Sequence, residues 1–126
     1  MVPKQDFILV VDDSSVNNLL MQNILEEEGY TILTVESGKE ALSMIRQKSP
    51  VLVILDIMMP DLDGFEVLEN LKTEDKTMNI PVMMLTARNN SRDKQKALAL
   101  GALDYIIKPI DIPDVIARIK RILKVS

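Results

Sequence analysis

The sequence predicts an α/β fold in which a doubly wound, five-stranded parallel sheet carries helices on both faces. Two short runs, 7–11 and 51–55, are apolar throughout and rich in β-branched residues, which is typical of strands buried on both sides. Strand-like and helix-like patterns then alternate along the rest of the chain. This alternation indicates right-handed βαβ units, so we expect five parallel strands and five helices.

The elements are predicted in chain order from apolar periodicity and from breaks at proline and glycine. The predicted strands are 7–11, 31–35, 51–55, 80–85 and 104–107. The predicted helices are 15–28, 37–46, a helix from residue 63, 91–100 and a helix from residue 111. A break at Ser49-Pro50 precedes the third strand, and Pro81 is acceptable only near the start of the fourth.

Helix ends are predicted from capping residues and helix faces from apolar spacing. The caps are Ser37 with Glu40, Asp63 with Glu66, and Asp111, and the stops are Gly29 and Gly101. On the first helix, one face carries Val16, Leu19, Leu20 and Ile24. The third helix is expected to point Phe65, Leu68 and Leu71 inward, and the last has a stripe of Ile112, Val115, Ile116, Ile119, Ile122 and Leu123. The helix at 91–100 is polar in its first half.

Composition limits the possible functions. With 126 residues, 47% of them hydrophobic, the chain fits a single domain over 1–126 with a substantial core. A net charge of -4 argues against nucleic-acid binding. The absence of cysteine and histidine excludes disulfides, Ser-His-Asp triads and histidine metal ligands. No signal peptide or membrane-spanning run is found, which predicts a cytoplasmic protein that does not bind membranes.

Charged and hydroxyl side chains follow four of the predicted strands. Asp12 and Asp13 follow the first, Asp56 the third, Thr86 the fourth and Lys108 the fifth. The carboxyl ends of parallel strands share one sheet edge, where ligands bind in such folds. Three clustered carboxylates repel one another unless a cation lies among them, and Mg²⁺ with a phosphate suits such a site. This set predicts phosphoryl transfer to an aspartate, assisted by a lysine and a threonine.

Four ordered segments resemble the receiver domains of two-component response regulators, of the chemotaxis-regulator type. They are 10–13 (VVDD), 56–64 (DIMMPDLDG), 86–87 (TA) and 101–109 (GALDYIIKP), and together they extend over nearly the whole chain. The resemblance implies a flavodoxin-like sheet with strand order 2-1-3-4-5. One departure is Ile110, where many members carry an aromatic residue after Lys-Pro, a difference that affects packing rather than chemistry.

The resemblance also implies a metal site. Asp56 would accept the phosphoryl group and, with Asp13, ligate Mg²⁺, for which Mn²⁺ is the alternative. Asp12 would order the ion through water, and Met58 would supply its backbone carbonyl.

Further roles follow from the same resemblance. Thr86, Ala87 and Lys108 would contact the phosphoryl group, Thr86 and Lys108 as catalytic residues. Thr86 and Tyr105 would form a switch pair, in which Thr86 moves toward the phosphate and Tyr105 follows. Tyr105 could instead be ordinary edge packing, and an X-Pro bond in cis is plausible at Lys108-Pro109.

Other functions fit the residues less well. Asp12 and Asp13 taken alone could simply cap the next helix. A flavodoxin-like flavin-binding domain would share the strand order, but Asp12-Asp13 would repel the flavin phosphate, and aromatic residues make up only 3%. A phosphatase with an aspartyl intermediate would need two aspartates spaced by one residue after the first strand, whereas here they are adjacent.

The expected function is a phosphoacceptor switch that catalyses only its own phosphorylation and dephosphorylation. The donor would be a sensor histidine kinase, a histidine phosphotransfer protein or a small acyl phosphate. The helix from Ser91, the fifth strand and the last helix would form the surface read by a protein target or a fused output domain, with the chain a monomer or a weak dimer when phosphorylated. Residues 11–17 look similar to the corresponding segment of receiver domains attached to hybrid kinases.

The lifetime of the phosphoryl group is expected to depend on two flanking residues. Met58 and Arg88 would flank the site and slow the attack of water on the phosphoryl group.

Overall fold

The structure is a computed structural model that describes residues 6–87 and 91–124. The strands are β1 Ile8–Val11, β2 Ile32–Val35, β3 Leu52–Asp56, β4 Val82–Thr86 and β5 Asp104–Ile107. The helices are α1 Ser15–Glu27, α2 Gly38–Lys48, α3 Gly64–Thr73, α4 Ser91–Ala99 and α5 Ile112–Ile122. Each predicted element is therefore present, with ends within a few residues of the predicted ones.

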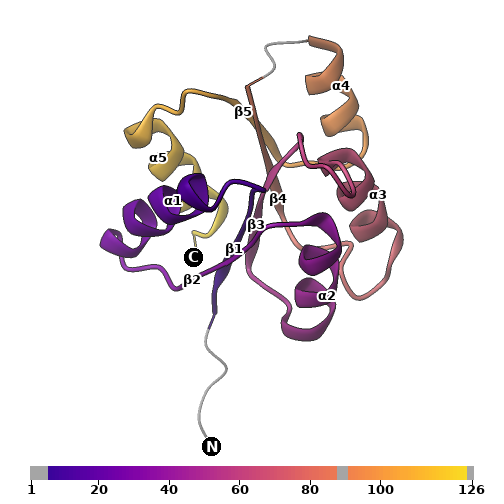
Figure 1. The fold of residues 1–126 in the computed structure, drawn as a ribbon, viewed down its shortest axis with the longest axis horizontal. Helices are drawn as coiled ribbons and strands as arrows, with labels where there is room; N and C mark the ends of the chain where they lie inside the picture. Colours follow the sequence, from indigo (N-terminus) through magenta and orange to yellow (C-terminus); the bar gives the residue numbers. More distant parts are fainter. Residues whose placement is uncertain (1–5, 88–90, 125–126) are drawn as a thin grey trace, which may run out of the picture.

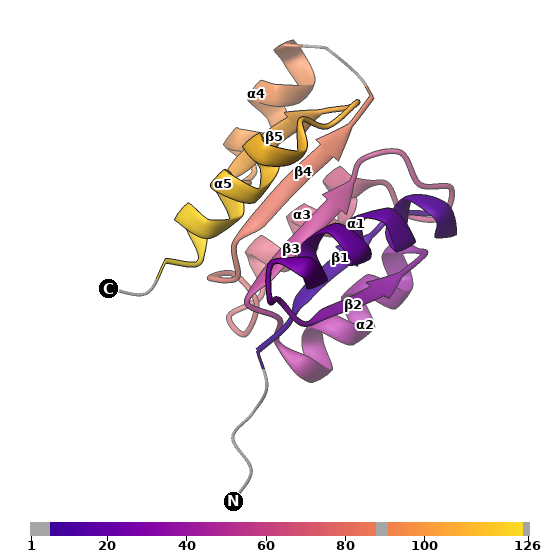
Figure 2. The ribbon, with the colours of Figure 1, turned by 90° about the vertical axis from the view of Figure 1, so that its left-hand side faces the viewer.

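The five strands form one parallel sheet in the order β2-β1-β3-β4-β5, which confirms the predicted fold class and strand order. Helices α1 and α5 cover one face of the sheet, and α2, α3 and α4 cover the other (Figure 1). Figure 2 shows the sheet from the side of α1 and α5, which lie in front of it. Strand order reverses between β1 and β3, and Val11 pairs with Leu55 across that junction. The next residues along these two strands are Asp12 and Asp56, so pairing register alone brings them to neighbouring positions.

Alternation along the strands divides the core into two layers. Between the sheet and α1 and α5 lie Ile8, Val10, Leu52, Ile54, Met83, Leu85 and Ile106, packed against Met21, Leu25, Val115 and Ile119. The other layer contains Leu9, Val11, Val53, Leu55 and Met84, together with the buried faces of α2, α3 and α4. Asp56 follows Ile54 by two positions, so the alternation assigns it to the α1–α5 side of the sheet, whereas Tyr105 packs in the α2–α4 layer.

The predicted helix caps are confirmed. Ser37 Oγ accepts a hydrogen bond from the Glu40 backbone N–H at 3.1 Å, and Asp63 and Glu66 form a complete capping box. Asp111 accepts from the Asp114 backbone N–H at 3.1 Å. Gly29 and Gly101, which end α1 and α4, have φ of +94° and +105°, a region that favours glycine.

Of the apolar face indicated for α1, Ile24 packs against the core, but the rest of that face is not the packing face. Val16, Leu19 and Leu20 are 66%, 58% and 56% exposed, whereas Asn18, Met21 and Leu25 are buried. Asn18 is fixed in the interior by two hydrogen bonds to backbone carbonyls at strand ends, and this places the helix face that runs through residues 18, 21 and 25 against the sheet. The packing face carries Met21 and Leu25 but also the polar Asn18, so apolar spacing favoured the other face.

The buried faces of α3, α4 and α5 agree better than that of α1 with the apolar patterns of their sequences. Phe65, Leu68 and Leu71 of α3 are buried, as predicted. On α5, Val115 and Ile119 are buried, but Ile112 at the start of the stripe is 44% exposed. Ala97 is the buried residue of α4, which agrees with its polar sequence. Among the described residues, no helix is long and apolar enough to cross a membrane.

Candidate functional site

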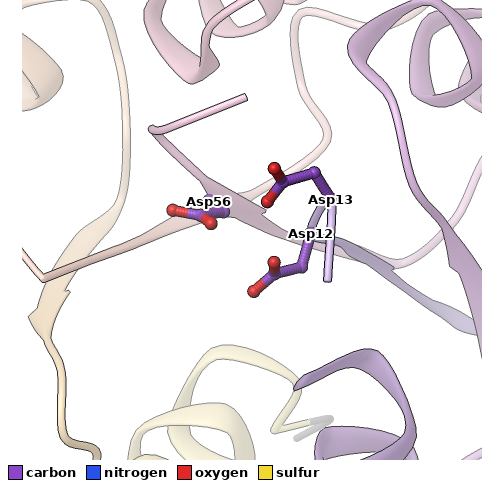
Figure 3. A group of neighbouring side chains, drawn as sticks. All are labelled: Asp12, Asp13 and Asp56. Carbon is purple, nitrogen blue, oxygen red and sulfur yellow. The ribbon is translucent and has the colours of Figure 1, made fainter. Parts of the chain in front are cut away.

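Three carboxylates meet at the carboxyl edge of the sheet. Asp12 and Asp13 follow β1 and Asp56 ends β3, and one oxygen atom from each lies within 4.8 Å of the others. Figure 3 shows the three side chains grouped at these strand ends, with the Asp13 carboxylate directed toward Asp56. Asp12 and Asp56 are buried, whereas Asp13 is exposed to solvent. The predicted cluster is confirmed, and its oxygen-only donor set suits Mg²⁺.

Lys108 lies within ion-pairing distance of two of these carboxylates. Its Nζ is 3.0 Å from Asp12 Oδ2 and 3.6 Å from Asp56 Oδ2. The residue follows β5, and its backbone N–H donates to the Thr86 carbonyl at 2.7 Å, which ties the two neighbouring strand ends together. The Lys108-Pro109 bond is cis, as the sequence suggested. The positive charge of Lys108 offsets only part of the negative charge of three carboxylates.

Asp56 is held in an environment that disfavours its charge. Burial raises the pKa of Asp56, and the neighbouring Asp12 and Asp13 raise it further; Lys108 and the Met58 N–H act in the opposite direction. The Met58 N–H donates to Asp56 Oδ1 at 3.2 Å. A buried carboxylate near two others gains stability from a bound cation, because the cation offsets both the burial of charge and the repulsion.

The loop after Asp56 is folded tightly against α3 and α2. A Cβ at Gly64 would lie 2.7 Å from the Asp56 carbonyl oxygen, so only glycine allows α3 to begin here. Farther along the loop, Asp61 accepts hydrogen bonds from the backbone N–H groups of Gly38 and Lys39 at 3.1 and 3.0 Å. Asp61 thus caps α2 from another segment and anchors the loop that carries Met58.

Two asparagines of α1 support Asp12, and neither is singled out by the apolar or acidic patterns of the sequence. Asn18 Nδ2 donates to the backbone carbonyls of Asp12 and Val35, both at 3.0 Å, and Asn17 Nδ2 lies 3.4 Å from Asp12 Oδ2. Asp12 Oδ1 also accepts from the Ser14 N–H at 2.9 Å. The signal available in the sequence was a pair of amides about one helical turn after the acidic pair.

The remaining predicted site residues differ in burial and in their position relative to the carboxylate cluster. Thr86 ends β4 and is fully buried, and Ala87 follows it on the surface. Tyr105 of β5 is buried in the α2–α4 layer, so the two predicted members of the switch pair lie on neighbouring strands. The Met58 side chain is 55% exposed beside the site. Arg88 lies outside the described residues, and its flanking role stays a prediction.

The comparisons with known proteins agree with this geometry. Residues 8–120 match the response regulator receiver domain family. The alkaline phosphatase synthesis transcriptional regulatory protein PhoP of Bacillus subtilis is 44% identical over 94% of this chain and 49% of its own length. The chain spans about half the length of the curated regulators it matches.

Solved structures give the same result. Chemotaxis protein CheY4 of Vibrio cholerae has a TM-score of 0.87 at 28% identity, covering 94% of this chain and 99% of that one. The signal receiver domain of a signal transduction histidine kinase from Syntrophus aciditrophicus has a TM-score of 0.86 at 34% identity, covering 96% and 94%. The flavin-binding alternative receives no support from these comparisons, and the carboxylates of Asp12 and Asp13 after β1 would repel a flavin phosphate there.

Proposed function

Because this chain belongs to the response regulator receiver domain family of two-component signalling, we propose that it accepts a phosphoryl group on Asp56 with Mg²⁺ bound. The observation that supports this proposal is the position of Asp56. It is buried, within 4.8 Å of Asp12 and Asp13, and 3.6 Å from the Lys108 ammonium group. The domain would catalyse only its own phosphorylation and dephosphorylation.

The three carboxylates suit the cation. Asp13 and Asp56 would ligate Mg²⁺ directly, the Met58 carbonyl would supply another oxygen, and Asp12 would act through water; Mn²⁺ is the alternative ion. When bound, the ion neutralises the cluster so that an anionic phosphoryl group can approach. Lys108 contacts Asp12 and Asp56, and it would pair with the transferred oxygens.

The chemistry uses the Asp56 carboxylate as the nucleophile. One Asp56 oxygen attacks phosphorus, and the bond from phosphorus to the donor breaks with its electron pair leaving on the donor. With a phosphohistidine donor, the leaving atom is an imidazole nitrogen. Thr86 and Ala87 would then donate to the phosphoryl oxygens from the end of β4. Burial raises the pKa of Asp56, and a bound cation would favour its ionised form. Attack by that ionised carboxylate would need no general base.

The output would be a shift in conformation at the far edge of the sheet. Thr86 would move toward the phosphoryl group and Tyr105 would follow, which would alter the surface of α4, β5 and α5. The matched regulators are about twice the length of this chain, which supports a transcriptional output region as the partner of such a surface. A sensor histidine kinase or histidine phosphotransfer protein would supply the phosphoryl group.

Mass spectrometry tests the assignment. Incubation with acetyl phosphate and Mg²⁺ should add one acid-labile phosphoryl group, and Asp56→Ala should lose it. The matched control is Asp75→Asn, a change at an aspartate in the α3–β4 loop away from the cluster, which should be modified like the parent. Phosphate found on a serine or threonine, or no modification of the parent protein, would contradict the proposal.

A further inference from the structure

A groove between α1 and α5 opens beside the acidic cluster, and no role in the proposed function uses it. We propose that this groove binds the acyl group of small acyl phosphates, so that the domain prefers phosphodonors with a longer apolar acyl chain over acetyl phosphate. The inference rests on Asp56 as phosphoacceptor and adds a preference among acyl phosphate donors.

The groove is apolar in its body and polar at one end. Its volume is about 330 Å³, and its walls include Val10 and Leu85 from the sheet, Met21 and Ile24 from α1, and Ile110 before α5. This volume is at the lower end of the range for small-molecule sites, about 300–1,000 Å³. A site of this size and composition fits a short alkyl or aryl group.

The polar end of the groove belongs to the phosphorylation site. Asp12 and Lys108 line the groove and form an ion pair at 3.0 Å. Asp56 does not line the groove, yet Lys108 reaches it at 3.6 Å, so one ammonium group faces both the groove and the acceptor. In-line transfer requires the leaving group to depart on the side of phosphorus away from Asp56. The proposal therefore has the phosphoryl group between Asp56 and the groove, with the acyl group entering the groove beside Lys108.

Charge at this end selects the kind of ligand. Lys108 pairs with Asp12 and Asp56, and its single positive charge is outweighed by the three carboxylates of the cluster. An anionic head group is therefore repelled unless a divalent cation is also bound. An acyl phosphate satisfies both parts of the site, since its phosphoryl group would bind with Mg²⁺ and its alkyl chain would bury apolar surface. A wholly apolar ligand would leave the polar end without a partner.

The mouth of the groove is open to an entering ligand. Leu20, 56% exposed, and Ile112, 44% exposed, extend the apolar surface there. Ile110 also lines the groove, and it follows Lys108 and Pro109, which line the groove too, directly in the sequence. A larger side chain at position 110 would therefore take up the space that the proposal assigns to the acyl chain.

The transfer is balanced without any further reactant. A bond forms between an Asp56 carboxylate oxygen and phosphorus, and the bond between phosphorus and the acyl oxygen breaks. The electron pair stays on that oxygen, which leaves as a carboxylate, and no proton is transferred. The released carboxylate is anionic, so the acidic cluster favours its departure.

The test compares a series of n-alkanoyl phosphates as donors with Mg²⁺, following phosphorylation of Asp56 by mass spectrometry. Each methylene fully buried in the groove should lower KM about fourfold, and hexanoyl phosphate should have a KM at least about tenfold below that of acetyl phosphate. Phosphoramidate, which has no acyl group, gives the reference rate for each variant.

Two variants locate the effect. Ile110→Phe should fill the groove and bring the ratio of the acetyl and hexanoyl KM values close to one. Leu20→Ser alters an exposed side chain at the mouth, which keeps folding intact, and should reduce the same ratio. Leu98→Phe, a change at a 45% exposed residue of α4, is the matched control and should keep the parent ratio.

A direct binding measurement accompanies the kinetics. With Mg²⁺, hexanoylphosphonate, which cannot transfer its phosphoryl group, should shift the methyl NMR signal of Met21 but not that of Met84 in the other core layer. Equal KM values across the series for the parent protein, or chain-length dependence that survives Ile110→Phe, would overturn the inference and leave Asp56 as the acceptor. Failure of every donor would instead refute the proposed function itself.

Discussion

The charge of Asp56 should destabilise the metal-free fold, and Asp56→Asn tests this directly. At an effective dielectric constant of about 20, two like charges at the 4.8 Å limit of the cluster repel by about 3.5 kcal/mol. Lys108, 3.6 Å from Asp56, attracts it by about 4.6 kcal/mol and so offsets more than one but less than two such repulsions. Water screens the repulsion from exposed Asp13, so we expect a net gain of about 1–2 kcal/mol from the substitution.

The substitution leaves the other contacts of the site in place. The amide oxygen of the introduced asparagine can still accept from the Met58 N–H, and Lys108 keeps its 3.0 Å pair with Asp12. Urea unfolding in EDTA at neutral pH should therefore show a higher free energy of unfolding for Asp56→Asn than for the parent. Asp75→Asn, which changes an aspartate outside the cluster, should leave it unchanged.

Magnesium should reduce this difference. Millimolar Mg²⁺ should raise the melting temperature of the parent protein, because a ligand that binds only the folded state stabilises it, and should raise that of Asp56→Asn less. Two results together would refute the idea that repulsion among the clustered carboxylates destabilises the metal-free fold. They are a lower free energy of unfolding for Asp56→Asn than for the parent in EDTA, and a parent melting temperature that does not change when Mg²⁺ is added.

Three further predictions concern pH, lifetime and the support of the site. Because burial raises the pKa of Asp56, the folded state binds its proton more tightly than the unfolded state; the metal-free parent should lose stability as pH rises through that raised value, a slope that Asp56→Asn should remove in urea titrations at several pH values. Met58→Asn combined with Arg88→Glu should speed loss of the phosphoryl group about tenfold, which corresponds to about 1.4 kcal/mol of barrier. An unchanged half-life of the phosphorylated form would show that these two side chains do not set the rate of dephosphorylation. Asn18→Ala should cost about 1–3 kcal/mol and weaken Mg²⁺ binding in calorimetry, whereas Thr77→Val, which removes a buried hydroxyl in the α3–β4 loop, should lower stability alone.

The residues of the site could be predicted because strand geometry dictates where they lie. The apolar runs that end at Asp12 and Asp56 predict buried parallel strands, and the carboxyl ends of such strands share an edge. Pairing of Val11 with Leu55 then brings the two carboxylates together without any further information. Lys108 was predictable for the same reason, since its strand is also parallel and it follows the last strand residue, Ile107.

The sequence did not determine which face of α1 packs against the sheet. Spacing favoured the face of Val16, Leu19 and Leu20, but the structure buries Asn18 instead, because its amide satisfies the Asp12 and Val35 carbonyls. A polar residue on a packing face has no signature in apolar periodicity. Its partners are backbone groups at the ends of two strands, and those are known only once the strands are in place.

The apolar strand runs, the capping residues and the order of strands and helices determined the sheet and its acidic edge, because these depend on local geometry and on the parallel course of the strands. The rotation of α1, the support that Asn18 gives to Asp12, and the groove that Ile110 lines beside Lys108 were decided by tertiary packing. The physical reason is that a helix can turn about its own axis without changing its sequence pattern. Only contacts with distant segments fix that rotation and the space left between neighbouring helices.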